Sequence, residues 1–274
     1  MNFTKMHGNG NDFIVIEDYD NEYVNKESLL AEKLCHRKFA IGADGILLVR
    51  RCEDAHIEMV IINSDGSYAA MCGNGLRCFV KYVYEKNICR SNPMRVKTGD
   101  GIKTVFIEED KLEVKSIKVN MGKPSFDPKD IPVDVSDKII NYPLNLEKTY
   151  NITSLRMGVP HTVIFNVLDE VNIEEGRAIE KASIFTEGTN VNFCEIVDKN
   201  HIKVKTWERG AGPTLACGTG NCASAFVANY LGLVDKDINV EVQGGTLRIL
   251  IENDEVYMIG NAEFVCEGKV LISI

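Results

Sequence analysis

The chain contains one short phrase twice, once in each half: Cys-Gly-Asn-Gly at 72–75 and Cys-Gly-Thr-Gly at 217–220. Apolar residues follow each phrase at the i, i+3, i+4, i+7 spacing of an amphipathic helix. We therefore expect each cysteine to stand where a Gly-rich turn enters a helix. Unpaired backbone N–H groups and the helix dipole favour negative charge there, so a thiol loses its proton more easily. Two matched, activated thiols indicate a reaction that needs two acid/base groups.

Other features recur in the same order around the two cysteines. A polar residue precedes each by nine positions, Asn63 in one half and Glu208 in the other. A strand–Gly–strand pattern follows each, and the segment 10–16 resembles 158–164. Four pairs in one order indicate duplicated halves, whereas a solenoid needs at least three repeats. We expect two similar lobes that share a cleft, with one cysteine on each wall.

Size and charge narrow the class of protein. A length of 274 residues predicts roughly two domains. A net charge of −9 argues against a nucleic-acid partner. No apolar run reaches the length of a membrane span, and the N-terminus opens into a strand-like segment rather than a signal peptide. Nine cysteines without a secretory signal indicate reduced thiols, so we expect a cytoplasmic protein.

Strand-like runs dominate the chain and helical stretches are few, which predicts an α+β fold. Beyond the two cysteine helices, which should end near Asn87 and Gly232, we expect a helix over Glu27–Arg37 and a shorter one over Ile173–Lys181. Asn25 or Ser28 is the expected cap of the first of these. The segment 121–150 holds four of the seven prolines and is the expected crossing between lobes.

Four other roles could explain the cysteines: burial in the core, zinc binding, hydrolysis and ligand binding without chemistry. Five of the cysteines are expected to be small buried hydrophobes: Cys35, Cys52, Cys89, Cys194 and Cys266. A zinc site built from Cys72, Cys78, Cys217 and Cys222 is disfavoured, because both second cysteines lie within helices. A cysteine hydrolase with His161 or His7 as base does not explain a duplicated cysteine. A binding module without chemistry would not need thiols at two helix entries.

Polar residues near the cysteines suggest substrate contacts. Glu208 and Arg209 are either a surface ion pair or a clamp for a zwitterionic substrate. In the clamp, Glu208 accepts from an ammonium and Arg209 donates two hydrogen bonds to a carboxylate. We favour the clamp because it precedes Cys217. His161 is as compatible with a structural role as with a functional one. The amides Asn11, Asn63, Asn74 and Asn190 can donate and accept hydrogen bonds, or merely form turns.

Taken together, these motifs resemble the diaminopimelate epimerases, within the cofactor-independent amino-acid racemases and epimerases. The similarity spans nearly the whole chain, in the segments 5–13, 63–67, 72–78, 208–212 and 216–220. The resemblance implies two pseudosymmetric lobes, each a closed or nearly closed, mostly antiparallel sheet around a central helix, with the active site between them. It places the last strand in the first lobe, so the expected domains are 1–118 with 264–274, and 119–263. It also implies a homodimer that uses neither metal nor pyridoxal phosphate.

The resemblance assigns roles to individual residues. Cys217 would remove the α-proton and Cys72 would return one on the opposite face, in the direction from LL- to meso-diaminopimelate. His161 and Glu208 would assist the cysteines and hold the reacting ammonium. The remaining contacts with substrate would come from backbone N–H groups at the helix starts and from polar side chains: Gly73, Asn74, Gly218, Thr219, Asn11, Asn63, Asn190 and Arg209.

Two positions depart from the familiar pattern. Gly45 stands where some members have Gln, and Val159 stands where many have Asn. Both amides would touch the substrate, so their loss leaves the thiol chemistry intact but opens the choice of substrate. Lanthionine, histidine and proline are the alternatives. The retained pair Glu208–Arg209 favours a second zwitterionic centre, and hence diaminopimelate.

Overall fold

The computed structural model describes residues 1–271 and divides the chain into two compact units. Unit 1 comprises Met1–Val119 together with the chain from Gly260 onward, and unit 2 comprises Asn120–Ile259. The expected boundaries were 118/119 and 263/264. The return to unit 1 begins earlier, because Arg77 Nε donates to the Asn261 carbonyl at 3.1 Å and His7 pairs with Glu263. Residues 272–274 of the expected last strand lie outside the described residues.

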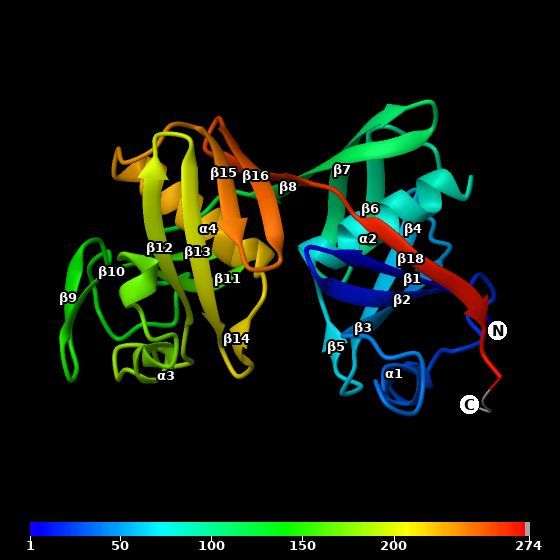
Figure 1. Cartoon of the computed structure of the whole chain (residues 1–274), viewed down its shortest axis with the longest axis horizontal. Coiled ribbons are helices and arrows are strands. Elements are labelled where there is room, and N and C mark those ends of the chain that lie inside the picture. Colours follow the sequence, from blue (N-terminus) through cyan, green and yellow to red (C-terminus); the bar gives the residue numbers. More distant parts are fainter. Residues whose placement is uncertain (272–274) are drawn as a thin grey trace. The chain divides into compact units, whose positions relative to one another are not determined.

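Unit 1 is a sheet wrapped around one buried helix, α2 (Figure 1). Its strands pair in the order β18–β1–β2–β3–β4–β6–β7–β8, with β5 also on β4. The helices are α1 (Glu27–Leu34) and α2 (Gly73–Glu85), and the strands are β1 (Asn2–Gly8), β2 (Asn11–Glu17), β3 (Gly45–Arg50), β4 (Ile57–Asn63), β5 (Tyr68–Ala69), β6 (Met94–Thr98), β7 (Gly101–Asp110), β8 (Glu113–Gly122) and β18 (Glu263–Lys269).

Unit 2 is built in the same way around α4 (Figure 1). Its strands pair in the order β9–β10–β11–β12–β13–β15–β16–β17, with β14 also on β13. The helices are η1 (Leu168–Glu170), α3 (Glu175–Glu180) and α4 (Gly218–Tyr230), and the strands are β9 (Tyr142–Asn145), β10 (Thr149–Met157), β11 (Val159–Phe165), β12 (Asn190–Asp198), β13 (His201–Glu208), β14 (Gly212–Thr214), β15 (Asp237–Val242), β16 (Gly245–Glu252) and β17 (Glu255–Gly260).

The two units repeat one topology. In each, two of the pairings are parallel: β2–β3 and β4–β6 in unit 1, and β11–β12 and β13–β15 in unit 2. In each, a short helix lies between the first parallel pair, and the cysteine helix follows a two- or three-residue strand. The α+β class and the duplication expected from the sequence are confirmed.

Burial on both faces of the sheet holds the central helices in place. All six residues of β3 are buried, because one face packs on α2 and the other faces α1. Ile46 and Leu48 join Leu30 and Leu34 in the outer core, whereas Leu47 meets Gly75 at the start of α2. The continuous apolar run Ile46–Val49 is the pattern of a strand buried on both faces.

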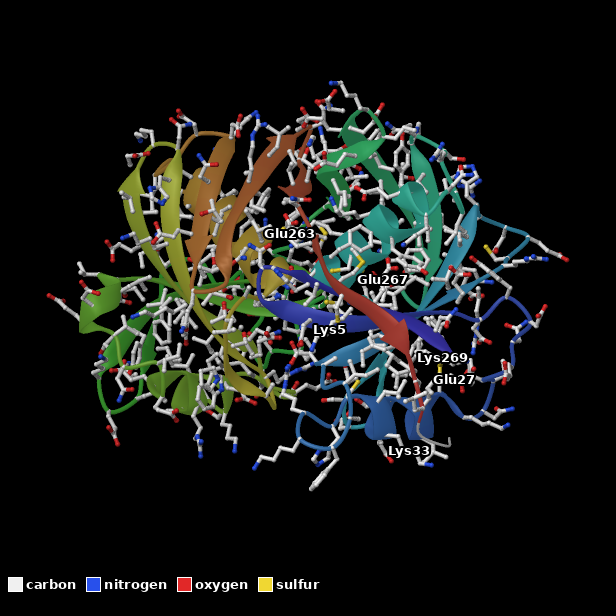
Figure 2. All side chains as sticks on the ribbon, turned by 45° about the vertical axis from the view of Figure 1, so that its right-hand side comes forward. Lys5, Glu27, Lys33, Glu263, Glu267 and Lys269 are labelled. Atoms are coloured by element: carbon white, nitrogen blue, oxygen red, sulfur yellow. The ribbon has the colours of Figure 1, made fainter. Side chains whose placement is uncertain are left out.

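Strand β18 pairs with the first strand of unit 1. Residues of β18 pair antiparallel with β1, from Asn2 opposite Lys269 to His7 opposite Glu263. Figure 2 labels Lys5 on β1 and Glu263, Glu267 and Lys269 along β18, side by side in this view.

The expected crossing in the proline-rich segment is wrong. The division between units falls within β8, between Val119 and Asn120. The prolines lie beyond it, in a segment whose Phe126 and Ile131 are buried. Backbone bridges from Ser125 to Arg156 and from Val133 to Phe185 fasten this segment within unit 2. Proline removes backbone donors, and here it marks an irregular segment of one unit rather than a linker.

Candidate active site

Cys72 caps the N-terminus of α2. Its backbone is extended (φ −142°, ψ 118°), and its sulfur accepts a hydrogen bond from the Gly75 N–H at 3.4 Å. The Leu76 N–H donates to the Cys72 carbonyl as the first intrahelical bond. An α-helix offers no acceptor to its first N–H groups, here those of Gly73 and Asn74. The helix start therefore presents donors and a positive dipole end beside a thiol.

Two of the predicted substrate amides lie beside Cys72. Asn11, at the start of β2, has its Oδ1 3.4 Å from the Cys72 sulfur. Asn74, buried in the first turn of α2, has its Nδ2 3.5 Å from the same oxygen. Unit 1 thus brings Asn11, Cys72, Gly73 and Asn74 together.

Asn63 is exposed at the end of β4. Its Nδ2 donates to Ser67 Oγ at 3.0 Å, and its carbonyl accepts from the Gly66 N–H at 3.0 Å. This is the turn chemistry that its sequence context predicts. Gly45 pairs directly opposite Asn63. A Cβ at Gly45 would lie 2.6 Å from the Ile62 carbonyl, so the backbone here is fitted to glycine.

Cys217 occupies the N-cap position of α4, as Cys72 does in α2, but its side chain makes no capping hydrogen bond. Its backbone is also extended (φ −113°, ψ 109°), and its sulfur lies 3.5 Å from Thr219 Oγ1. The Cys217 side chain is buried, whereas Cys72 is half-buried. Gly218 and Thr219 supply the first N–H groups of this helix. The prediction that each cysteine stands at a helix entry is therefore correct in both units.

His161 is fully buried on β11, and its contacts define its tautomer. Asn192 Nδ2 lies 3.2 Å from His161 Nδ1, while Asn192 Oδ1 accepts from Thr206 Oγ1 at 3.1 Å. Asn192 Nδ2 also donates to the Thr162 carbonyl at 3.2 Å, and a carbonyl only accepts, so the nitrogen faces His161 Nδ1 as donor and the His161 proton resides on Nε2. That Nε2 has no hydrogen-bond partner among residues 1–271. Burial, followed by the charge of Arg209, lowers the pKa of His161 to about 3, so the ring is a neutral N–H donor at pH 7.

The depressed pKa of His161 gives a stability prediction. Unfolding restores the imidazole to a pKa near 6.5, so the unfolded state binds the extra proton and stability falls as the pH drops from 6.5 toward 3. Between pH 7 and pH 5 the wild type should lose about 2 kcal/mol more unfolding free energy than His161→Gln. Urea titrations at the two pH values measure this difference. Equal losses in both proteins would contradict a neutral buried imidazole.

The predicted clamp lies at the turn after β13. Thr214 Oγ1 donates to Glu208 Oε1 at 2.7 Å. Arg209 is exposed, and its Nη1 donates to the Glu187 carbonyl at 2.9 Å. Asn190 is buried, with its Nδ2 on the Pro160 carbonyl at 2.9 Å and its Oδ1 on the Arg209 N–H at 2.9 Å. Asn190 therefore supports the turn that carries Glu208 and Arg209, through its hydrogen bond to the Arg209 backbone.

Glu180 also fixes this turn. Its carboxylate accepts from Trp207 Nε1 at 2.7 Å and from the Gly210 N–H at 3.1 Å, on either side of the clamp pair. The side chain comes from α3, far back in the sequence, so no local pattern indicated it. Asn192 and Asp44 were missed for the same reason, although the Asn190-Val-Asn192 alternation in an otherwise apolar strand was a usable signal.

Removal of the Glu180 carboxylate should destabilise unit 2. Glu180→Ala leaves the Trp207 and Gly210 donors without their acceptor, at about 1–3 kcal/mol each. We expect the unfolding free energy to fall by about 2–4 kcal/mol, measured by chemical denaturation. Glu180→Gln keeps one carbonyl acceptor and should lose less. A smaller loss in the alanine variant than in the glutamine variant would contradict this account.

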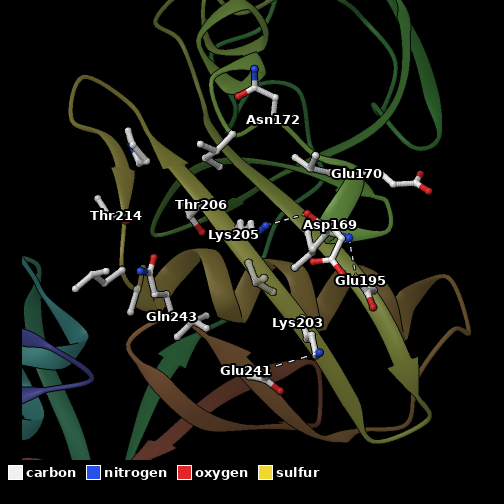
Figure 3. A pocket seen from close by; sticks show the side chains of 18 residues that line it. Asp169, Glu170, Asn172, Glu195, Lys203, Lys205, Thr206, Thr214, Glu241 and Gln243 are labelled. Carbon is white, nitrogen blue, oxygen red and sulfur yellow. Dashed lines mark hydrogen bonds and ion pairs between the residues drawn. The ribbon is translucent and has the colours of Figure 1, made fainter.

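A cavity of about 840 Å³ opens on unit 2, on the side of β13 seen in Figure 3. Lys205 Nζ donates there to the Leu168 carbonyl at 2.8 Å, and Glu195 accepts from the Leu168 N–H at 2.7 Å. The lining includes Thr214 and Ala216, just before Cys217, but not Cys217, His161 or Glu208. Its lining residue Thr214 donates to Glu208, so the cavity adjoins the predicted site without including those residues.

Two further expectations concern cysteines and membranes. Cys35 and Cys194 are buried as predicted and Cys52 and Cys89 are partly so, whereas Cys266 is exposed. The prediction for Cys266 is wrong, because every residue of β18 except Phe264 is exposed. Among residues 1–271, no helix is long and apolar enough to cross a membrane.

Known proteins resemble the chain along its whole length. The family model described as diaminopimelate epimerase matches residues 3–126 and 153–265. A protein named diaminopimelate epimerase from Clostridium perfringens (strain 13 / Type A) is 60% identical, with 99% of this chain and 100% of the relative covered. One of the same name from Methanocaldococcus jannaschii is 42% identical, with 99% of each covered.

Solved structures share the fold at low sequence identity. A PhzF-family phenazine biosynthesis protein from Bacillus anthracis matches with a TM-score of 0.70 and 17% identity, over 99% of both chains. A probable proline racemase from Agrobacterium radiobacter K84 matches with a TM-score of 0.70 and 13% identity, over 99% of this chain and 93% of the other. These likenesses concern the fold alone. The family model and the full-length relatives together show that the chain belongs to the diaminopimelate epimerase family.

Proposed function

We propose that the enzyme interconverts LL- and meso-2,6-diaminopimelate by proton transfer between the α-carbon and two cysteines. One observation supports this above all: Cys72 and Cys217 each occupy the N-cap position of a helix that begins with Gly-x-Gly. Each provides a titratable group beside backbone donors, which suits a carboxylate or a developing negative charge. The names of the full-length relatives support the choice of substrate.

In the proposed reaction, the Cys217 thiolate takes the α-proton of the LL isomer and becomes a thiol. The electron pair of the C–H bond stays on the α-carbon and spreads onto the α-carboxylate. Backbone N–H groups of Gly73, Asn74, Gly218 and Thr219 stabilise that charge. The Cys72 thiol then delivers its proton to the opposite face and is left as a thiolate, and the reverse direction exchanges the two roles.

The polar side chains then act as binding and assisting groups. His161, a neutral Nε2–H donor, assists the thiols, and Glu208 assists them and accepts from the reacting ammonium. Arg209, Asn11, Asn63 and Asn190 contact or support the non-reacting end. The protons move between the two thiols and the α-carbon, and backbone donors carry the charge, so the reaction as proposed uses no metal and no pyridoxal phosphate. We further propose a cytoplasmic homodimer, in keeping with nine cysteines and the family resemblance.

Proton exchange in deuterated water tests this proposal. The enzyme should incorporate deuterium at the α-carbon of LL-diaminopimelate and form the meso isomer, both detectable by NMR. Serum albumin at equal thiol concentration serves as the control for non-specific exchange. Incorporation with L-histidine or L-proline but none with diaminopimelate would overturn the substrate, and no incorporation with any of them would overturn the reaction.

A further inference from the structure

The Asn11 side chain lies between a carboxylate and a thiol. Its Nδ2 is 2.8 Å from Asp44 Oδ2, and its Oδ1 is 3.4 Å from the Cys72 sulfur. A carboxylate only accepts hydrogen bonds, so the amide nitrogen must face Asp44. The carbonyl oxygen of Asn11 must then face Cys72. This orientation follows from the chemistry of Asp44 and needs no assignment from the amide itself.

Asp44 is held in turn by its neighbours. Arg37 Nη2 lies 2.7 Å from Asp44 Oδ1, and the Asp12 N–H donates to Asp44 Oδ2 at 3.1 Å. Burial alone would raise the pKa of Asp12, but its bonds to Arg37 and Lys5 outweigh this effect and lower the pKa to about 2. Arg37 therefore donates two hydrogen bonds to the ionised carboxylate of Asp12 and one to Asp44.

A second chain of contacts agrees with this orientation from the other side, through a longer contact than the one to Asp44. The Arg77 side chain is fully buried, and its Nη2 donates to Asn74 Oδ1 at 2.9 Å. Arginine only donates, so the Asn74 nitrogen is left to face Asn11 Oδ1, at 3.5 Å. Asn11 thus presents an acceptor to the space it shares with Asn74 and Cys72.

An acceptor beside a sulfur favours the thiol over the thiolate, because only S–H donates a hydrogen bond. The Gly75 N–H acts in the opposite sense. The charged and titratable groups on the elements around Cys72 include Lys5 and His7 of β1, Asp12 of β2, Arg37 and Asp44 before β3, and Arg77 and Cys78 of α2. Farther along the same elements are Glu17 of β2 and Lys81, Tyr82, Tyr84 and Glu85 of α2.

From this geometry we propose that Asp44, fixed by Arg37, is a positioning residue. It holds the Asn11 carbonyl on Cys72 so that Cys72 rests as the thiol, ready to donate its proton. This inference rests on the proposed two-thiol reaction and assigns the resting proton within it. Asp44 acts only through Asn11 and touches no reacting atom.

Alkylation of Cys72 tests the proposal without any need for epimerase activity. The rate of iodoacetamide labelling is followed against pH by mass spectrometry of the peptide 52–77, with fragment ions that separate Cys72 from Cys52. Asp44→Asn allows Asn11 to turn its nitrogen toward the sulfur. The pKa of Cys72 should then fall by about one unit or more, which speeds labelling about tenfold below that pKa. Exposed Cys266 is the internal reference and should not change.

A double-mutant cycle separates the amide from the lost charge. Loss of the Asp44 charge alone would also lower the pKa of Cys72, but it would do so with or without Asn11. In the Asn11→Ala background, Asp44→Asn should therefore change the Cys72 pKa by much less than in the wild type. Asp44→Ser is the second variant should Asp44→Asn fold poorly, because a hydroxyl can also donate to the turned amide.

The outcomes are distinct. An unchanged Cys72 pKa in Asp44→Asn, or an equal shift in the Asn11→Ala background, overturns the positioning role. A shift that depends on Asn11 supports it. Neither result bears on whether diaminopimelate is the substrate, which the deuterium exchange decides.

Discussion

Replacement of either N-cap cysteine by serine should lower kcat by roughly 10²–10⁴-fold, the range for loss of a general acid or base. A serine hydroxyl at the same helix start keeps the backbone donors but does not ionise near pH 7. Cys72→Ser and Cys217→Ser should therefore bind substrate and fail to interconvert the isomers. Measurement of LL-to-meso conversion in both directions is the test.

The two serine variants should also differ from each other. If Cys217 removes the proton of the LL isomer, Cys72→Ser should still exchange that proton with solvent deuterium, whereas Cys217→Ser should not. Cys266→Ser is the matched control, since this exposed thiol on β18 lies outside the proposed site. Interconversion at a near wild-type rate by either variant would rule out a two-base mechanism.

Selectivity for a second carboxylate should depend on Arg209. A site whose arginine pairs with a carboxylate rejects ligands that lack this carboxylate, because the arginine is then left without a partner. We expect kcat/KM for L-histidine and L-proline to be about 10³-fold or more below that for LL-diaminopimelate. The value for L-lanthionine should be close to that for diaminopimelate, since both ends carry the same groups.

Arg209→Leu should lower kcat/KM for diaminopimelate by about 10²-fold, the effect of losing a bidentate, charge-assisted hydrogen bond to a carboxylate. Its stability should change little, because Arg209 is exposed. Arg248→Leu, an exposed arginine on β16 paired with Asp237, is the control. Preserved selectivity in Arg209→Leu would place the recognition of the far carboxylate elsewhere.

Local sequence signals predicted the helix entries because their causes are local. The Gly-rich turn and the apolar spacing after Cys72 and Cys217 suffice to start a helix. The helix ends were also local: α2 stops at Glu85 and Asn87 adopts φ 60°, and α4 stops at Tyr230 and Gly232 adopts φ 72°. The cap of α1 was wrong, since Lys26 stands there without a side-chain bond.

The residues that support the site could not be predicted from the sequence, because their contacts join segments that lie far apart in the chain. Asp44 reaches Asn11 across 33 residues, and Glu180 reaches Trp207 across 27. Carboxylates such as these look like ordinary surface residues until the sheet brings them beside an amide or an indole. The resemblance supplied the residues that touch substrate, but not those that orient them.

The pairing of β18 with β1 has a consequence for the order of folding. Unit 2 is one continuous segment, Asn120–Ile259, whereas unit 1 needs residues from both ends of the chain. During synthesis β1 emerges first and remains without this neighbour until β18, the last strand within residues 1–271, leaves the ribosome. Such long-range pairing is slow, and an unpaired strand edge invites association with other chains. The half of the protein that is made first is thus the half that is finished last.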